Sequence, residues 1–431
     1  MTIYIQGLSA LAHYRSSDAT TEPERCPRSI AALDSAVSSR AACTAARVWR
    51  MGIDEPTVDC PLEVLVRDKS QRSRSKAVIA RVWGKPIART AFRRASKDVY
   101  VSSPEFVFLQ LATRLDLLEL VALGMELCGT YRRNVKVPVL GTNDTELITL
   151  YQQKPLTNPK RLGSFIKSMP STPGHARAMK ALGYVLANSA SPMETALYLL
   201  LCLPRRFGGY ALPKPVLNPP ITLSKAGRMY TLRSVAKPDL YWKDFHLDLE
   251  YNSDEFHDES SRAFDSMRRK ALERMGVEVI ELTKEELLST RFLHATAQRI
   301  ARRMKKQLRP QSEGNFEGRR ASLRDLLLAR DDSQDSASSC SRDEEQLHPD
   351  GYDFCSDDMY MSDVPEGAPV FDDADMIDMP SDMGELADTW WADASPEITD
   401  TPYDEDLSWS DDEIYVYGGR SGKENRPKVE E

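Results

Sequence analysis

The amino-acid sequence predicts an α/β protein that ends in a disordered acidic tail, and three observations lead to this prediction. Alternating and continuous apolar runs, typical of strands and helices, succeed one another through the first 310 residues. Residues 237–283 read as strand, turn, strand, basic helix and strand. From residue 311 onward Ser, Asp and Glu dominate, and apart from a short helix at 322–329 too little apolar surface is available to offset the entropy of ordering.

The net charge of −8 conceals a division between the body and the tail. Residues 311–431 contain 34 Asp and Glu against nine Lys and Arg, a net charge of −25, so residues 1–310 carry +17. A basic body attracts phosphate backbones, and an acidic tail competes for the same surface. We therefore expect DNA as a partner and an intramolecular contact between the tail and the body.

Composition also narrows the class of protein. The longest apolar run, residues 196–203, is far shorter than the roughly 20 residues of a spanning helix, so no membrane partner is expected. The first residues lack the basic start and apolar block of a secretory leader, which predicts a cytoplasmic protein. The seven cysteines are scattered and contain no Cys-x-x-Cys pair, which argues against a disulfide framework and a structural zinc site.

Residues 1–130 are predicted to form an α+β domain. Residues 2–15 predict a strand and then a helix, and residues 62–66 and 77–83 predict strands that flank a basic loop. That loop either contacts phosphate or is a solvated hairpin loop. The Ala-rich residues 31–51 are compatible with a helix-turn-helix or with an ordinary helical pair.

A helix start follows the next predicted strand, at residues 98–101. Ser103 can cap the helix, Pro104 suits its first turn, and Glu105 faces the positive end of its dipole. Two strongly apolar helices follow. This pattern resembles the middle part of AbiEi-type antitoxin and regulator proteins, which implies a regulatory, DNA-binding role and a toxin or other protein partner. The polar residues 131–184 read as a helical connector.

Two carboxylates frame the turn inside residues 237–283. Asp239 closes the first strand and Glu250 lies near the end of the second. Because each strand residue advances only about 3.3 Å, an antiparallel hairpin can bring both carboxylates to one divalent ion. Oxygen ligands and phosphate substrates favour Mg²⁺ or Mn²⁺ over zinc. The sequence therefore predicts a metal site at this hairpin.

Two basic helices follow the predicted metal site in sequence. One covers residues 261–275 and is ended by Gly276, and the other covers residues 291–309 and is amphipathic. Both favour a nucleic-acid surface, although a solvated face remains the alternative for the second helix. The candidate nucleic-acid contacts are Arg268, Arg269, Lys270, Arg302 and Arg303.

The order of these parts resembles the core of PD-(D/E)XK nucleases, and within them the branch near the very-short-patch-repair (Vsr) mismatch endonucleases. The resemblance covers roughly residues 185–310 and implies a restriction-endonuclease-like α/β/α domain that hydrolyses phosphodiester bonds in DNA. It further implies Glu194, in the helix that opens the domain, as a metal ligand, and His257 as a base or phosphate contact. The matching motifs are residues 191–196, 250–253, 256–257, 264–270 and 276–283.

One departure from this pattern leaves two functions open. Asn252 stands where the superfamily has a lysine that polarises the attacking water, and an amide neither carries charge at pH 7 nor accepts a proton. The role is vacant unless Lys270, Arg268 or His257 fills it. The chain is therefore either a DNA endonuclease with catalytic residues Asp239, Glu250, Asn252 and His257, or a catalytically degenerate, antitoxin-like DNA-binding regulator.

Overall fold

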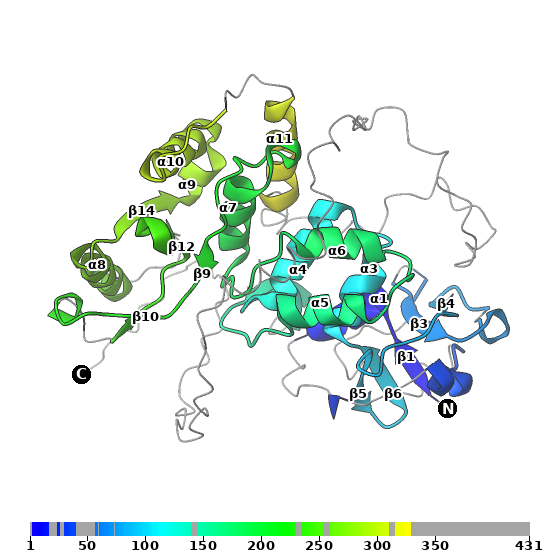
Figure 1. Cartoon of the computed structure of the whole chain (residues 1–431). Coiled ribbons are helices and arrows are strands. Elements are labelled where there is room, and N and C mark those ends of the chain that lie inside the picture. Colours follow the sequence, from blue (N-terminus) through cyan, green and yellow to red (C-terminus); the bar gives the residue numbers. More distant parts are fainter. Residues whose placement is uncertain are drawn as a thin grey trace, which may run out of the picture. The chain divides into compact units, whose positions relative to one another are not determined.

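The computed structural model describes residues 2–16, 24–25, 30–39, 57–58, 60–72, 74–138, 145–229, 231, 234–252, 259–309 and 315–328 (Figure 1). This part of the chain is mixed α/β, as predicted. His257, most of the Ala-rich segment at 31–51 and the acidic stretch from residue 329 onward lie outside the described residues. The helix-turn-helix and the tail contact predicted from sequence therefore remain predictions.

The first sheet is built around the N-terminal strand. It has six strands in the order β2-β5-β6-β1-β3-β4, with β1 parallel to β6 and antiparallel to β3. Its apolar strands are largely buried, because alternate residues pack on the core and the sheet is covered by helices. The strands are β1 (Ile3–Ile5), β2 (Glu24–Arg25), β3 (Leu62–Val66), β4 (Val78–Val82), β5 (Phe92–Ser96) and β6 (Val99–Ser102).

The basic loop between β3 and β4 is a crossover and not a hairpin loop. β3 and β4 pair in parallel, from Leu62 opposite Val78 to Val66 opposite Val82. A two-strand hairpin would require antiparallel pairing, so the prediction of a hairpin is wrong, although most of the described loop residues are exposed to solvent as that alternative expected. Sequence alternation identified both strands but carries no information on their relative direction.

The described residues of the N-terminal part also form five α-helices. Ser103 caps α3 as predicted, because its hydroxyl accepts a hydrogen bond from Phe106 N at 3.3 Å. The predicted connector at 131–184 contains a hairpin, β7 (Arg132–Pro138) with β8 (Thr145–Leu150), and the helices α5 and α6, which pack on α3 and α4 (Figure 1). The helices are α1 (Gly7–Tyr14), α3 (Pro104–Leu111), α4 (Leu117–Cys128), α5 (Pro159–Lys167) and α6 (His175–Leu182).

The second sheet contains the predicted metal-site hairpin. Its four strands have the order β14-β13-β12-β9, in which β12 is antiparallel to both neighbours and β13 is parallel to β14. The helix α8 (Glu259–Arg274) connects the two parallel strands, so the predicted order of strand, turn, strand, helix and strand is confirmed. The strands are β9 (Val216–Leu217), β12 (Leu240–Trp242), β13 (Leu247–Asn252) and β14 (Glu278–Thr283).

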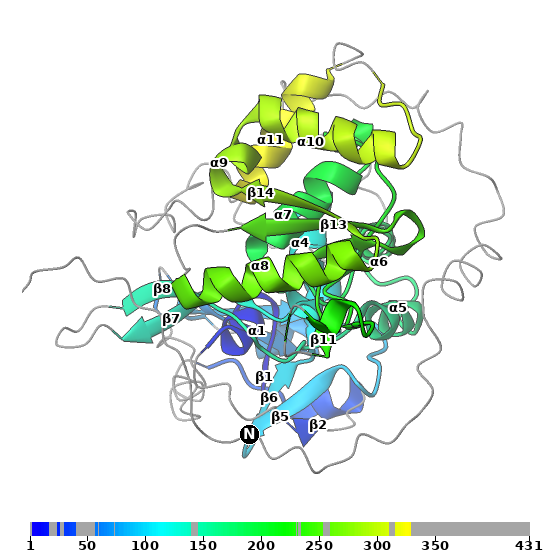
Figure 2. The same cartoon turned by 90° about the vertical axis from the view of Figure 1, so that its left-hand side faces the viewer.

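Helices cover both faces of the second sheet. On one face Ala271 and Leu272 of α8 share an apolar cluster with Tyr241 of β12, and Figure 2 shows α8 in front of the strands. On the other face Leu247 and Leu249 of β13 belong to the main core. That core also contains residues of α7 (Pro192–Cys202), α9 (Lys284–Leu288) and α10 (Thr290–Arg303).

The folded body extends past residue 310, where the acidic tail was predicted to begin. Helix α11 (Phe316–Leu328) is longer than the helix expected at 322–329, and it contacts α7 and the short helix η4 (Arg205–Phe207). Phe316, Leu323 and Leu327 are buried. Their spacing of seven and four residues places them on one helix face, and that face needs a partner surface that the sequence does not identify.

The described ranges hold no helix that is both long and apolar enough to cross a membrane.

Candidate functional site

Glu194 lies at the start of α7, where the cap motif holds it. Ser191 caps the helix and its hydroxyl accepts from Glu194 N at 3.0 Å. The Glu194 carboxylate is buried and accepts at Oε2 from Ala190 N at 2.9 Å and from Asn218 Nδ2 at 2.6 Å. Asn218 N also donates to Asp239 O at 3.1 Å. These bonds place the glutamate beside the first of the two hairpin carboxylates.

Asp239 and Glu250 lie opposite one another at the open end of the β12–β13 hairpin. Asp239 immediately precedes β12, so the prediction that it closes this strand is wrong. Leu240 pairs with Leu249, and Asp239 therefore faces Glu250 across the two strands. Asp239 Oδ2 accepts from Tyr251 N at 2.8 Å. Burial raises the pKa of Asp239 well above its usual value, and the charges of Glu250 and Glu194 raise it further. The three predicted metal ligands are therefore close enough to interact electrostatically.

Arg268 on α8 faces this carboxylate cluster. Its Nη2 donates to Glu250 Oε2 at 2.7 Å, and its Nη1 donates to Lys237 O at 3.4 Å. The Arg268 charge opposes the rise in the pKa of both Asp239 and Glu194. Of the basic residues predicted to contact nucleic acid, Arg268 is the one that the structure brings to the carboxylates.

A fourth acidic residue, Asp248, was missed by the sequence analysis. It is fully buried in β13, two positions before Glu250 and thus on the same strand face. Burial raises its pKa to about 7, and the charge of Asp239 contributes. A side-chain hydrogen bond with Glu250 and the charge of Arg268 partly oppose this rise in the pKa. An acidic residue between two leucines in a strand was the available signal.

The other predicted residues lie farther from the cluster or outside the description. Asn252 ends β13, is half-buried and pairs with Thr283 of β14, so it shares the Glu250 face of the strand. Lys270 is exposed on α8, and the neighbouring Arg269 forms an ion pair with Glu281 at 2.5 Å. His257 is not described.

The basic helix α10 lies on the opposite face of the sheet from α8. Arg303 Nε donates to Phe245 O at 3.2 Å, and Arg302 Nε donates to Gln298 O at 3.3 Å. Both arginines are exposed. They are available to a phosphate backbone, but the structure does not join them to the carboxylate cluster.

The donor chemistry of the cluster fits a hard divalent cation. Glu194, Asp239 and Glu250 supply carboxylate oxygens, the ligands that Mg²⁺ and Mn²⁺ prefer, and their mutual repulsion would be relieved by a cation. In the conformation of the described residues, however, no group of three or more His, Cys, Asp or Glu side chains is arranged to hold a metal. Arg268 binds Glu250 Oε2, the position from which a ligand would act.

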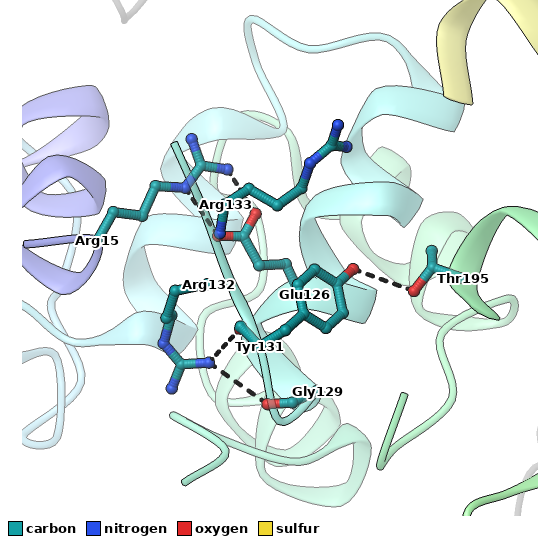
Figure 3. A network of polar contacts seen from close by, with 7 residues as sticks. All are labelled: Arg15, Glu126, Gly129, Tyr131, Arg132, Arg133 and Thr195. Atoms are coloured by element: carbon teal, nitrogen blue, oxygen red, sulfur yellow. Dashed lines mark hydrogen bonds and ion pairs between the residues drawn. The ribbon is translucent and has the colours of Figure 1, made fainter. Parts of the chain in front are cut away.

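A polar network anchors the start of α7, and with it Glu194, to the N-terminal part (Figure 3). Tyr131 Oη lies 3.0 Å from Thr195 Oγ1, and Thr195 Oγ1 lies 2.8 Å from Ser189 Oγ. On the other side of the network, Glu126 accepts from Arg15 Nε at 2.8 Å and from Arg133 N at 3.2 Å. Thr195, the residue after Glu194, is thus hydrogen-bonded to a residue 64 positions earlier in the chain.

The chain matches no known protein family, no curated protein and no solved structure at a significant level. The functional interpretation therefore depends on the residues of the site.

Proposed function

We propose that this chain is a divalent-metal-dependent, endonuclease-like protein that hydrolyses phosphodiester bonds in DNA at the Glu194, Asp239 and Glu250 cluster. The observation that carries the proposal is the crowding of three carboxylates where α7 begins and the β12–β13 hairpin opens. Buried carboxylates that repel one another are relieved by protonation or by a bound cation. The strand order and the α8 crossover agree with the PD-(D/E)XK core that the motifs resemble.

Glu194, Asp239 and Glu250 would hold the cation, and Mg²⁺ or Mn²⁺ suits these ligands. When bound, such an ion activates water and neutralises the charge that develops on the phosphodiester. The chain's own part is to hold the ligands in place. The Tyr251 N–H fixes Asp239, and the Asn218 amide and Ala190 N–H fix Glu194.

Arg268 provides a second function in this proposal. Its planar guanidinium neutralises Glu250 in the structure, at 2.7 Å, and its donors match the geometry of a phosphate group. The side chain is about one-third exposed, so it can reach a ligand from solvent. We assign it to DNA phosphate binding next to the carboxylates.

The ion pair between Arg268 and Glu250 also favours a second candidate, a degenerate nuclease domain that only binds DNA. Under this second candidate the Arg268 guanidinium stands in for the metal ion, because it already balances the charge of Glu250. Asn252 agrees with this candidate, since an amide cannot act as a base. The antitoxin-like pattern at residues 98–105, and a toxin or other protein as partner, belong to the same candidate.

Nicking of supercoiled plasmid by the full chain tests the first candidate. We expect nicking with Mg²⁺ or Mn²⁺ and none with EDTA. The Asp239→Asn/Glu250→Gln double variant should nick at least a hundredfold more slowly, because mutation of even the outer partners of a metal site lowers affinity or activity by about 10–100-fold. Glu281→Gln is the matched control. Glu281 is opposite Glu250 on β14, is exposed, and pairs with Arg269 instead of the cluster.

The outcomes separate the two candidates. Equal nicking by the double variant and by the wild-type chain would exclude the carboxylate cluster as the active site. DNA binding that is unaffected by EDTA, with no nicking under any metal, would favour the degenerate regulator. Binding is measured by fluorescence anisotropy on a labelled duplex in the same buffers.

A further inference from the structure

A small cavity lies in the N-terminal part, far in sequence from the carboxylate cluster. It is enclosed by the start of α1, the strands β3 and β4 and the end of α3, and its volume is about 20 Å³. Apolar side chains including Leu65 and Leu111 form part of the wall. The residues that contribute polar groups to the wall are Gln6, Gly7, Glu63, Arg81, Trp83, Gln110, Thr113 and Arg114.

The tight junction between β1 and α1 shapes this cavity. Gly7 begins α1 with a φ of +55°, a conformation that favours glycine, and a Cβ at this position would lie 2.1 Å from Glu63 Oε2. Glycine therefore lets the Glu63 carboxylate approach the helix start. Gly7 N donates to Gln110 Oε1 at 3.1 Å, which fixes the orientation of that buried amide.

The carboxylate and amide oxygens of the wall are already in use. Glu63 Oε1 accepts from Arg114 Nη1 at 2.5 Å, and Glu63 Oε2 accepts from Gln6 Nε2 at 3.3 Å. Two buried donors, Gln110 Nε2 and Arg81 Nε, have no hydrogen-bond partner among the described residues. Gln110 is only 7% exposed, so its unmade bond carries the desolvation penalty of a buried donor. The groups of the wall that can still bind a ligand are therefore these two hydrogen-bond donors.

The charges of the wall also favour an anion. Arg81 and Arg114 carry two positive charges against the single negative charge of Glu63. Burial lowers the pKa of Arg81, Glu63 raises it, and the neighbouring Arg114 lowers it again, although an arginine stays protonated at pH 7. An anion between the two guanidiniums would relieve their repulsion and satisfy both free donors.

The size of the cavity limits the ligand. One water molecule needs about 10–15 Å³ of such volume, so 20 Å³ admits one or two oxygen atoms of a ligand, whose remaining atoms would lie at the mouth of the cavity. A monovalent or divalent oxyanion, which presents acceptor oxygens in several directions, matches the free donors of the wall.

We propose that this cavity is a binding site for a small oxyanion, a carboxylate or a phosphate group, held by Gln110 Nε2 and Arg81 Nε beside Arg114. Neither its residues nor its ligand belong to the proposed nuclease site. The site is a place for a small-molecule effector or for the charged end of a larger ligand that enters from the mouth of the cavity. A negative result for DNA cleavage would not affect this proposal, and a negative result for oxyanion binding would not affect the proposed nuclease function.

Isothermal titration calorimetry on the full chain tests this site with sodium phosphate and sodium acetate, each compared with sodium chloride at equal ionic strength. We expect saturable binding of at least one oxyanion, weakened at least tenfold in Gln110→Glu. This substitution keeps the acceptor for Gly7 N but replaces the free donor with a negative charge. Tighter phosphate binding would assign a phosphate ligand, and tighter acetate binding a carboxylate.

Two further variants make the test specific. Arg81→Met removes the second free donor, and is expected to weaken binding at least tenfold even if Gln110→Glu does not fold, as judged by circular dichroism. Arg94→Met, at an exposed position of β5 outside the cavity wall, is the control and should bind like the wild-type chain. Binding no stronger than that of chloride, or equal weakening in Arg94→Met, would overturn the proposal.

Discussion

Burial determines the chemistry of single carboxyl groups in the candidate site. Asp248 has no exposed surface, and its pKa of about 7 lies far above the ordinary 3.8 because an ionised carboxylate is disfavoured away from water. Glu250, two residues later, is nearly as buried but has the Arg268 guanidinium at 2.7 Å. The two carboxylates share one strand face, but of the two only Glu250 forms a hydrogen bond to a guanidinium within the described residues.

The raised pKa of Asp248 predicts how its replacement changes stability with pH. A carboxyl whose folded pKa exceeds its unfolded pKa retains its proton longer in the folded state, so stability falls as pH rises from about 4 to about 7. Asp248→Asn removes this ionisation. We expect the variant to gain up to about 4 kcal/mol relative to the wild-type chain between pH 4 and pH 8, at about 1.36 kcal/mol per pKa unit.

Urea unfolding at pH 4 and pH 8 measures this change. Asp244→Asn, in the exposed turn η6 (Lys243–Phe245) between β12 and β13, is the matched control and should show the same difference between the two pH values as the wild-type chain. A stability difference between Asp248→Asn and the wild-type chain that does not change with pH would contradict the predicted ionisation.

At the scale of the element, α8 ends where the backbone takes a left-handed conformation. Gly276 has a φ of +82°, and no other side chain or backbone atom would lie within 4 Å of a Cβ placed there. The residue therefore acts through backbone conformation alone, as a glycine that terminates a helix does. This termination turns the chain into β14 within two residues, and β14 lies beside the strand that carries Glu250.

Gly276→Ala isolates this conformational effect. Because no neighbour obstructs the new methyl group, we expect a loss of roughly 1–2 kcal/mol, the cost of a left-handed conformation for a residue with a side chain. Gly84→Ala is the matched control. A Cβ at Gly84 also meets nothing within 4 Å, and Gly84 has no positive φ, so this change should be neutral or stabilising by up to about 1 kcal/mol.

Both variants are compared by urea unfolding at one pH. If the two substitutions change the free energy of unfolding equally, the positive φ at Gly276 does not determine the stability of the α8 end.

At the scale of the whole molecule, opposite charges are separated along the chain. Residues 1–328 carry a net charge of +17 and residues 329–431 a net charge of −25. Helix α11 belongs to the basic part, where it packs on α7 and η4, although it follows the predicted start of the tail. The described body therefore extends at least to Leu328 and does not end at residue 310.

Removal of the tail after Leu328 is predicted to strengthen DNA binding. The shortened chain loses an acidic segment that competes with phosphate, so its affinity for a DNA duplex at about 50 mM salt should rise at least tenfold. Fluorescence anisotropy measures the affinity. A chain of full length in which every Asp and Glu after residue 328 is replaced by Asn and Gln separates the effect of the tail's charge from the effect of its length. Unchanged affinity after the deletion would exclude competition by the tail.

A cut at residue 310 is expected to behave differently. It removes Phe316, Leu323 and Leu327 and exposes the surface of α7 and η4 that they cover. The melting temperature of this chain should be lower than that of the chain ending at Leu328, because apolar surface is returned to water.

Local features of the chain could be predicted from sequence because they depend on neighbours within a few residues. The caps at Ser103 and Ser191, the end of α8 at Gly276 and the element order of residues 237–283 follow from the hydrogen-bonding capacity of single side chains and from apolar periodicity. The proximity of Asp239 and Glu250 could be predicted as well, because the two strands of a short antiparallel hairpin lie side by side and bring residues at equal distances from the turn opposite one another.

Contacts between distant segments were decided only by the tertiary structure. Apolar periodicity does not predict which distant segments meet. It did not predict the parallel pairing of β3 with β4, the ion pair from Arg268 to Glu250, the burial of Asp248 or the packing of α11. Periodicity tells which face of an element is apolar, but the partner of that face, and whether a charge meets water, a guanidinium or neither, depends on the packing of the whole chain.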